Sequence, residues 1–242
     1  MFEKRYYKGI AVSYEPHLRG GGDNCGQQFR SVVKTTIGPV EHAFEYCAGC
    51  GFIGFSLLAY GFCRKLTVAD VNPEAVRCLK ETVKENGLED RVSVYLSDAL
   101  ADIPRTERWD LVVSNPPHLL STKAEYQKNI KAYDPDFSVH SNFYRDIGVF
   151  LKPGGSILFQ ENYYGTTPQD FTKMIEQNGL HIVRVFGVDR SLWFRDSLRD
   201  FAECFSRKPS FDYVIKCNNI ITARIRPNTT YFIWTQQNAK PT

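Results

Sequence analysis

The glycine-rich stretch at residues 45–54 constrains the fold more than any other part of the chain. It reads Glu-Tyr-Cys-Ala-Gly-Cys-Gly-Phe-Ile-Gly, and it follows the apolar pair Ala43 and Phe44, the end of a predicted strand. A helix is predicted to begin at Ile53. A turn of this kind between a strand and a helix lets a ligand approach backbone N–H groups. Because dinucleotide-binding folds use similar spacings, the neighbouring residues have to identify the ligand.

Three acids and one short motif stand at the ends of successive predicted strands. Glu45 opens the glycine turn, Asp70 ends the next strand, and Asp98 comes directly after the one that follows. A further strand runs into Asn115-Pro116-Pro117-His118. In a parallel sheet, ligands bind beyond the carboxyl ends of the strands. We therefore expect all of these residues to border one binding site.

Strand and helix patterns alternate along most of the chain, which is typical of a parallel sheet covered by helices on both faces. Helical periodicity is clear after Pro73, where Ala75, Val76, Leu79 and Val83 share one face. Further helices are predicted at 143–151 and 168–178. The predicted strands are the one ending at Phe44 and those at 65–70, 92–96, 109–114, 156–160, 181–188 and 230–234.

This series of motifs resembles the class I S-adenosylmethionine (SAM) methyltransferases, and within them the HemK-like N-methyltransferases with an Asn-Pro-Pro-aromatic motif. The resemblance covers about residues 41–161 and its four motifs occur in the expected order. It implies a Rossmann-like, doubly wound α/β fold with a mostly parallel, seven-stranded sheet and an antiparallel last strand. It also implies SAM as the cofactor.

The resemblance assigns cofactor-binding roles to several of these residues. Backbone N–H groups around Gly49 to Phe52, with Gly49 and Gly51 as the binding glycines, suit the SAM carboxylate and its neighbourhood. Glu45 is expected to attract the ammonium and the sulfonium, the alternative being a solvated carboxylate at a strand end. Asp70 is placed to accept from both ribose hydroxyls, and Val71 is placed to pack against adenine.

Two further features near the predicted cofactor site have alternative interpretations. Asp98 and Ala99 are expected to contact the adenine amino group, although Asp98 also has the position of a helix N-cap. Cys47 and Cys50 have C-x-x-C spacing, which raises a metal or redox interpretation. No second cysteine or histidine pair follows, so we interpret them as small residues in a tight turn and expect no metal.

Asn115, Pro116, Pro117 and His118 are the candidate catalytic residues. Prolines directly after a strand hold the chain rigid, and their carbonyls are expected to point into a pocket as acceptors. The Asn115 amide oxygen is another acceptor. Acceptors of this kind orient a planar N–H₂ group so that its lone pair faces the SAM methyl. The related enzymes usually carry Tyr or Phe in the fourth position, where it stacks on the substrate. His118 departs from that pattern and is a candidate to bind a carboxylate or to act as a base.

Segments on either side of the motifs are predicted to complete the domain. Residues 1–37 are expected to form a lid or cap, with a strand or hairpin around Tyr6 to Tyr14, a flexible loop at 18–24 and a helix from Gln27 to about Thr36. An ordinary surface turn at the glycine triplet is the alternative to a lid hinge. Residues 38–242 are the predicted SAM-binding domain, with an aromatic-rich insertion at about 189–224 that packs on the sheet or forms a pocket wall or dimer face.

A polar and aromatic loop follows the catalytic motif and is a candidate substrate cover. Core packing is the alternative for some of its members, Tyr126, Tyr133, Asp134, Asp136, Phe137 and His140. Residues 160–164, Gln-Glu-Asn-Tyr-Tyr, end the fifth predicted strand on the ligand side. Their involvement in the site is left open.

Composition restricts the class of protein. The net charge of +3 does not by itself imply nucleic-acid binding. Seven cysteines without a regular framework indicate reduced thiols and a cytoplasmic location. The charged N-terminus is unlike a signal peptide, and no apolar run is long enough to span a bilayer.

Three functions are compatible with these patterns. The first is N-methylation of a small molecule, with a protein or nucleic-acid amino group as alternative acceptor. The second is ring closure of SAM to azetidine-2-carboxylate and methylthioadenosine, motivated by loose similarity of residues 115–165 and by His118. The third is a non-catalytic SAM-binding partner of another subunit. A homodimer is compatible with all three.

Overall fold

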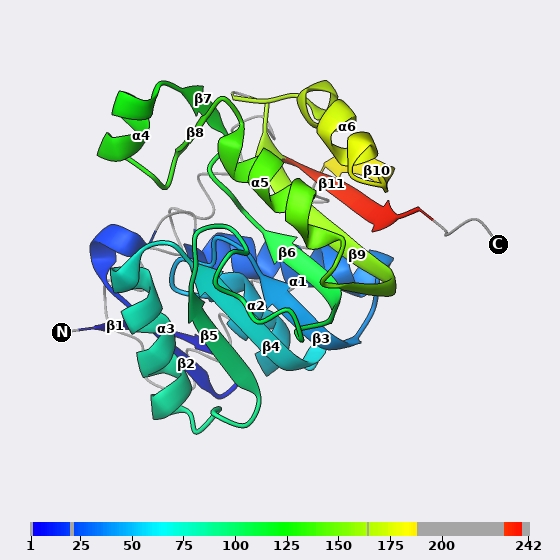
Figure 1. Cartoon of the computed structure of the whole chain (residues 1–242). Helices are drawn as coiled ribbons and strands as arrows, with labels where there is room; N and C mark the ends of the chain where they lie inside the picture. The colour runs from blue at the N-terminus through cyan, green and yellow to red at the C-terminus, as the bar shows by residue number, and fades with distance from the viewer. Residues whose placement is uncertain (1, 20–21, 164, 188–229, 239–242) are drawn as a thin grey trace.

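The core of the protein is a seven-stranded sheet, seen in a computed structural model that describes residues 2–19, 22–163, 165–187 and 230–238 (Figure 1). The strand order is β10-β11-β9-β6-β3-β4-β5, and all neighbouring pairs except those made by β11 are parallel. The strands are β3 (Val40–Glu45), β4 (Cys63–Asp70), β5 (Val92–Leu96), β6 (Trp109–Ser114), β9 (Leu151–Asn162), β10 (Leu180–Gly187) and β11 (Thr230–Gln237). The predicted α/β fold with an antiparallel last strand is confirmed.

Helices cover both faces of this sheet. The first face carries α1 (Gly22–Thr36), α2 (Phe52–Ala59) and α3 (Pro73–Glu85), and the second carries α5 (Ser138–Ile147) and α6 (Pro168–Gln177). Each face of the sheet has its own hydrophobic core. Successive residues of a strand pack into the two cores in turn, because side chains alternate between the faces. In β6, for example, Leu111 and Val113 pack in the first core and Val112 packs in the second. Burial on both faces explains the nearly continuous apolar runs of the central strands.

The N-terminal segment forms the predicted hairpin, from β1 (Glu3–Tyr7) and β2 (Ile10–Tyr14), followed by the short helix η1 (Pro16–Leu18). The hairpin is fixed on α3, where the Ser13 N–H donates to Thr82 Oγ1 at 2.9 Å. The Ala11 N–H donates to Asn86 Oδ1 at 2.8 Å. A role for this segment as a lid remains a prediction.

The loop predicted at 18–24 is shorter than expected, because α1 begins at Gly22 rather than at Gln27. Glycine is a poor helix former, so the sequence favours a loop here. Close packing between α1 and α2 explains its presence in the helix. A Cβ atom at Gly26 would lie 2.6 Å from the Phe52 carbonyl oxygen, and one at Gly22 would lie 2.9 Å from the Phe52 ring.

The region after the catalytic motif also differs from the prediction. Instead of one loop it contains β7 (Leu119–Ser121), α4 (Lys123–Lys128) and β8 (Tyr133–Pro135), with β7 and β8 paired in parallel. Helix α5 begins at Ser138, not at 143, and ends at Ile147. The early start depends on Asp134, whose Oδ1 accepts from the Val139 N–H at 2.8 Å. This cap precedes two residues with left-handed backbone, Asp136 and Phe137, which sequence patterns do not predict.

Two further observations concern the extent of the fold. The aromatic-rich insertion predicted at 189–224 lies outside the described residues. Within the part of the chain that the structure describes, no helix has both the length and the apolar character needed to cross a membrane.

Gly51 is expected to be essential for the packing of the glycine turn. Its φ is +81°, and a Cβ would lie 2.6 Å from the Phe55 ring and 2.7 Å from Leu79 Cδ2. Gly51→Ala should lower the free energy of unfolding by about 2–4 kcal/mol, from left-handed strain and overpacking together. Gly61→Ala is the matched control, since Gly61 has φ +76° with nothing within 4 Å, and should cost about 1 kcal/mol. Urea denaturation of both variants measures the difference, and equal losses would contradict the packing argument.

Candidate functional site

A cavity of about 310 Å³ lies at the carboxyl ends of β3, β4 and β6. Its size falls at the lower end of the range found for small-molecule sites. The predicted site residues that line it are Glu45, Gly49, Asp70, Val71, Asp98, Ala99, Asn115 and Pro117. Gly51, Pro116 and His118 are not among its lining residues. Lining residues that the sequence did not indicate include Arg19, Cys25, Lys131, Ser138, Val139 and Asn142.

Glu45 is buried and connects β3 to the first turn of α2. Its Oε2 accepts from the Gly54 N–H at 2.7 Å, and its Oε1 accepts from the Ile53 N–H at 3.2 Å. Burial raises the pKa of Glu45 to about 8, and these two N–H donors only partly offset it. The alternative of a solvated strand-end carboxylate is therefore wrong. A buried carboxyl with a raised pKa at the cavity wall suits a cationic ligand group, which would stabilise its ionised form.

Asp70 connects β4 to the glycine turn. Its Oδ2 accepts from the Gly49 N–H at 2.7 Å, and its Oδ1 accepts from the Asn72 N–H at 2.8 Å. Burial raises the pKa of Asp70, and the backbone donors lower it in part. Each carboxylate oxygen has a second lone pair, so Asp70 retains the capacity to accept from two ligand hydroxyls.

The glycines of the turn have a conformational role. Gly49 and Gly51 have φ of +54° and +81°, which glycine adopts without strain. The Gly49 N–H donates to Asp70, and the Gly51 N–H donates to the Ala48 carbonyl at 2.8 Å. These two N–H groups are therefore engaged within the protein, by Asp70 of β4 and by Ala48, and do not face a ligand carboxylate. Contact of the carboxylate with the other N–H groups of residues 49–52 remains a prediction. Cationic side chains at the cavity, Arg19 and Lys131, are alternative partners for a carboxylate.

Asp98 and Ala99 border the cavity in a segment of turns after β5. No helix begins there, so the N-cap interpretation of Asp98 is wrong. The adjacent Ser97 accepts from the Asp102 N–H at 3.1 Å and holds the turn. Contact of Asp98 and Ala99 with adenine remains a prediction.

Asn115 lines the cavity and is held from the opposite side by α1. Its Nδ2 donates to Cys25 Sγ at 3.4 Å, and the Cys25 thiol donates to Gln160 Oε1 at 3.4 Å. Pro117 also lines the cavity. The prediction that both proline carbonyls face the pocket needs correction, because the Pro116 carbonyl accepts from His118 Nδ1 at 3.0 Å.

That hydrogen bond defines the protonation of His118. A carbonyl only accepts, so Nδ1 carries the proton and Nε2 has the free lone pair in the neutral ring. Burial lowers the pKa of His118 below its ordinary value of 6.5, and the nearby Glu161 carboxylate raises it in part. At neutral pH His118 is therefore an uncharged ring with a basic nitrogen.

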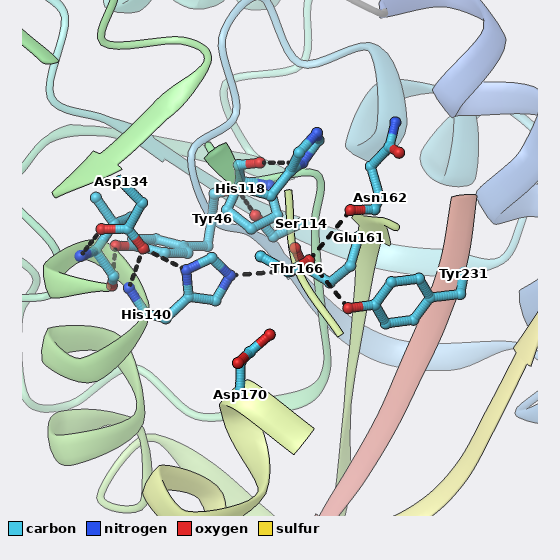
Figure 2. A network of polar contacts seen from close by, with 12 residues as sticks. Tyr46, Ser114, His118, Asp134, His140, Glu161, Asn162, Thr166, Asp170 and Tyr231 are labelled. Atoms are coloured by element: carbon cyan, nitrogen blue, oxygen red, sulfur yellow. Dashed lines mark hydrogen bonds and ion pairs between the residues drawn. The ribbon is translucent and has the colours of Figure 1, made fainter. Parts of the chain in front are cut away.

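A buried ionic cluster lies behind the catalytic motif. Figure 2 shows His140 of α5 between Asp134 of β8 and Glu161 of β9. His140 Nδ1 lies 2.5 Å from Asp134 Oδ2, and Nε2 lies 2.9 Å from Glu161 Oε1. All three side chains are at most 1% exposed. His140 is therefore a core residue, not part of a loop that covers substrate.

The cluster connects the elements that surround the motif. Burial alone would lower the pKa of His140, but the Glu161 and Asp134 carboxylates outweigh it and raise the pKa to about 9. An imidazolium thus holds two carboxylates from separate elements. Next to it, the Tyr46 hydroxyl donates to the Val139 carbonyl at 3.1 Å, and Thr166 contacts the Tyr231 hydroxyl at 3.0 Å (Figure 2). The first turn of α5 is in this way fixed against the cavity.

The comparisons with known proteins agree with this geometry. The family model described as the Methyltransferase small domain matches residues 23–169. A release factor glutamine methyltransferase of Bacteroides thetaiotaomicron is 29% identical over a 209-residue alignment that covers 73% of this chain and 73% of that protein. One of Clostridium acetobutylicum is 33% identical over 127 residues, 48% of this chain and 45% of that protein. The chain thus spans less than half the length of the second relative.

Further comparisons cover a different acceptor and the fold. A ribosomal protein uL3 glutamine methyltransferase of Francisella tularensis is 27% identical over 149 residues, 62% of this chain and 42% of that protein. Among solved structures, a putative sarcosine dimethylglycine methyltransferase of Galdieria sulphuraria superimposes with a TM-score of 0.57 at 12% identity. The match covers 97% of this chain and 94% of that one. At such low identity it supports the fold alone.

The chemistry of the cavity fits SAM. Glu45, Asp70 and Asp98 offer carboxylates to cationic and hydroxyl groups, and Arg19 and Lys131 offer cations to a carboxylate. The apolar Val71 lies beside Asp70 at the cavity wall, where it suits a planar base.

Asp70→Ala should weaken SAM binding by about 1–3 kcal/mol, the cost of losing charge-assisted hydrogen bonds. Titration calorimetry measures the affinity, and thermal unfolding checks that the glycine turn, which Asp70 also holds, remains folded. Asp102→Ala is the control, since Asp102 is exposed and is not among the cavity residues. Undiminished affinity of a folded Asp70→Ala variant would remove Asp70 from the site.

His140 should make stability depend on pH. Its folded-state pKa is raised from 6.5 to about 9, so its contribution is complete below about pH 6.5 and is lost as the pH rises through 9. His140→Gln should lower the free energy of unfolding by about 3–5 kcal/mol at pH 6, because it leaves buried carboxylates unpaired. The difference from wild type should shrink by pH 10. His181→Gln, at an exposed position, is the control. A difference independent of pH would show that His140 does not carry the charge.

Proposed function

Because the chain belongs to the Methyltransferase small domain family, whose members use SAM, we propose that it is a SAM-dependent N-methyltransferase that acts on a protein side chain. The observation that carries the proposal is the position of Asn115. This residue directly follows β6, lines the cavity together with Glu45 and Asp70, and is followed directly by two prolines.

Asn115 and Pro117 are the residues proposed to orient the acceptor. When bound, SAM supplies an electrophilic methyl group. The amide oxygen of Asn115 accepts an N–H of the substrate, which turns the nitrogen lone pair toward the cavity. Pro117 keeps the backbone rigid beside it. Glu45 contributes negative charge at the cavity wall near the expected position of the cationic ligand groups.

His118 is proposed to assist by accepting a proton or hydrogen bond through Nε2. The neutral tautomer fixed by Pro116 supports this role. A free imidazole nitrogen differs from the Tyr or Phe ring found at this position in the related enzymes, since it accepts from an N–H donor and does not only stack. His118 follows the cavity residue Pro117 but is not itself among the lining residues, so this role requires the acceptor to extend past Pro117 to His118 Nε2.

The acceptor that we propose is a side-chain amide of glutamine in a protein. The names of the relatives support it, since they act on release factors or on ribosomal protein uL3. The names support neither a small-molecule acceptor, nor ring closure of SAM, nor a non-catalytic partner role. A homodimer also has no support in them.

One assay distinguishes these possibilities. The purified chain is incubated with methyl-labelled SAM and with a release factor or uL3, and mass spectrometry locates the methylated residue. The proposal expects label on a glutamine side chain. SAM alone is the control, since accumulation of methylthioadenosine without label transfer would instead support ring closure. Label on neither protein, with SAM consumed only in the presence of a small molecule or nucleic acid, would overturn the protein-directed proposal.

Asn115→Ala should separate catalysis from binding. The substitution removes one acceptor and leaves β6 and both prolines, so kcat should fall roughly a hundredfold while the SAM Kd changes much less. Asn115→Asp is the matched variant, because it keeps an acceptor oxygen but adds charge near Glu45. Single-turnover kinetics and calorimetry measure the two effects. Equal losses of binding and turnover would make Asn115 a cofactor or structural residue.

A further inference from the structure

We propose that Cys25 of α1 is a positioning residue that fixes which end of the Asn115 amide faces the acceptor. The inference rests on the proposed function, since it concerns how Asn115 is oriented for methyl transfer. Cys25 stands 90 residues before Asn115 in the sequence, and it lines the same cavity. Nothing in the sequence pattern marks it as part of the site.

Cys25 belongs to an uncharged chain of hydrogen bonds with a buried centre. Gln160 Nε2 donates to Gln28 Oε1, which leaves Gln160 Oε1 for the Cys25 thiol at 3.4 Å. Asn115 Nδ2 then donates to Cys25 Sγ at 3.4 Å. Gln160 is 2% exposed and Cys25 is 8% exposed. The chain thus links α1, the end of β9 and the catalytic motif, with the half-buried Gln28 and Asn115 at its two ends.

The direction of the donors determines the orientation of Asn115. Gln160 presents its oxygen to Cys25 because its nitrogen is engaged by Gln28. The thiol therefore donates toward Gln160, and only its lone pairs remain for Asn115. Asn115 must therefore donate its N–H₂ group to the Cys25 sulfur, and its carbonyl oxygen then faces the cavity. That oxygen is the atom that the proposed chemistry needs.

If the Asn115 amide were flipped, its N–H₂ group would face the N–H of the substrate nitrogen that is to be methylated. Two facing N–H groups repel one another and leave a buried donor unsatisfied, which is costly. Among the residues that the structure describes, Cys25 is the hydrogen-bond partner given for the Asn115 side chain, and it is the contact that distinguishes the two ends of the amide. We therefore expect loss of Cys25 to lower turnover through Asn115, with little effect on the binding of SAM.

The first test does not need an acceptor substrate. Asparagine is labelled with ¹⁵N, and the Asn115 side-chain amide is assigned by its absence in Asn115→Ala. Cys25→Ala should shift that resonance and accelerate its hydrogen exchange roughly tenfold, the effect of losing one neutral hydrogen bond. Cys25→Ser keeps both a donor and an acceptor and should preserve much of the protection.

Cys63→Ala is the matched control, because Cys63 is a buried cysteine of β4 outside the cavity lining. It should change stability without moving the Asn115 resonance. An Asn115 resonance that is the same in wild type and Cys25→Ala would overturn the inference. This result would leave the proposed function intact, so the two fail separately.

The second test is a double-mutant cycle in the methyl-transfer assay. Cys25→Ala should lower kcat roughly tenfold in the wild-type background and leave the SAM Kd nearly unchanged. In the Asn115→Ala background the same substitution should have no further effect on kcat. Independent losses in the two backgrounds would show that Cys25 acts by another route. Should Cys25→Ala fail to fold, Gln160→Leu breaks the same chain at its next member and has the same expected outcome.

Discussion

The carboxyl group of Glu45 holds together the part of the structure on which the site depends. It joins the end of the central strand β3 to the first turn of α2 through the N–H groups of Ile53 and Gly54. The glycine turn between them is closed by this contact, and Asp70 anchors its other end at Gly49. Two buried acids therefore shape the backbone of the cavity, and a cationic ligand would favour the ionised form of Glu45, whose pKa burial raises to about 8. The side chains that hold the turn are thus the same ones that we expect to bind the ligand.

The alternation of side chains along β9 divides the wall behind the catalytic motif into two halves. Gln160 faces α1 and joins the uncharged chain that includes Cys25 and Asn115. Its neighbour Glu161 faces α5 and joins the ionic cluster with His140. Adjacent residues of a strand point to opposite faces, so the two networks do not mix. The neutral half contains the residue that we propose to orient the acceptor, whereas the ionic half connects β8, α5 and β9.

Sequence patterns predicted those features of the fold and the site that depend on residues close together in the chain. The βα alternation, the acids at strand ends and the two prolines after β6 are visible as periodicity and spacing. The start of α5 was not predictable, because Asp134 caps it from four residues outside the helix and across two left-handed residues. The contact between Cys25 and Asn115 depends on the packing of α1, which no local pattern encodes. His118 was identified as unusual, but its tautomer follows only from the Pro116 carbonyl.

The position of β11 has a consequence for how the chain reaches its native state. This strand is the last of the described elements in the sequence, yet it lies between β9 and β10 and pairs with both. During synthesis β9 therefore presents an unpaired edge, and β10 has no described strand to pair with, until residues 230–237 have emerged from the ribosome. A chain terminated before residue 230 would lose two strands from the sheet, not one. It would also lose Tyr231, the partner of Thr166 beside the ionic cluster. Early termination would accordingly yield an incomplete sheet with an exposed, aggregation-prone edge and not a smaller functional domain.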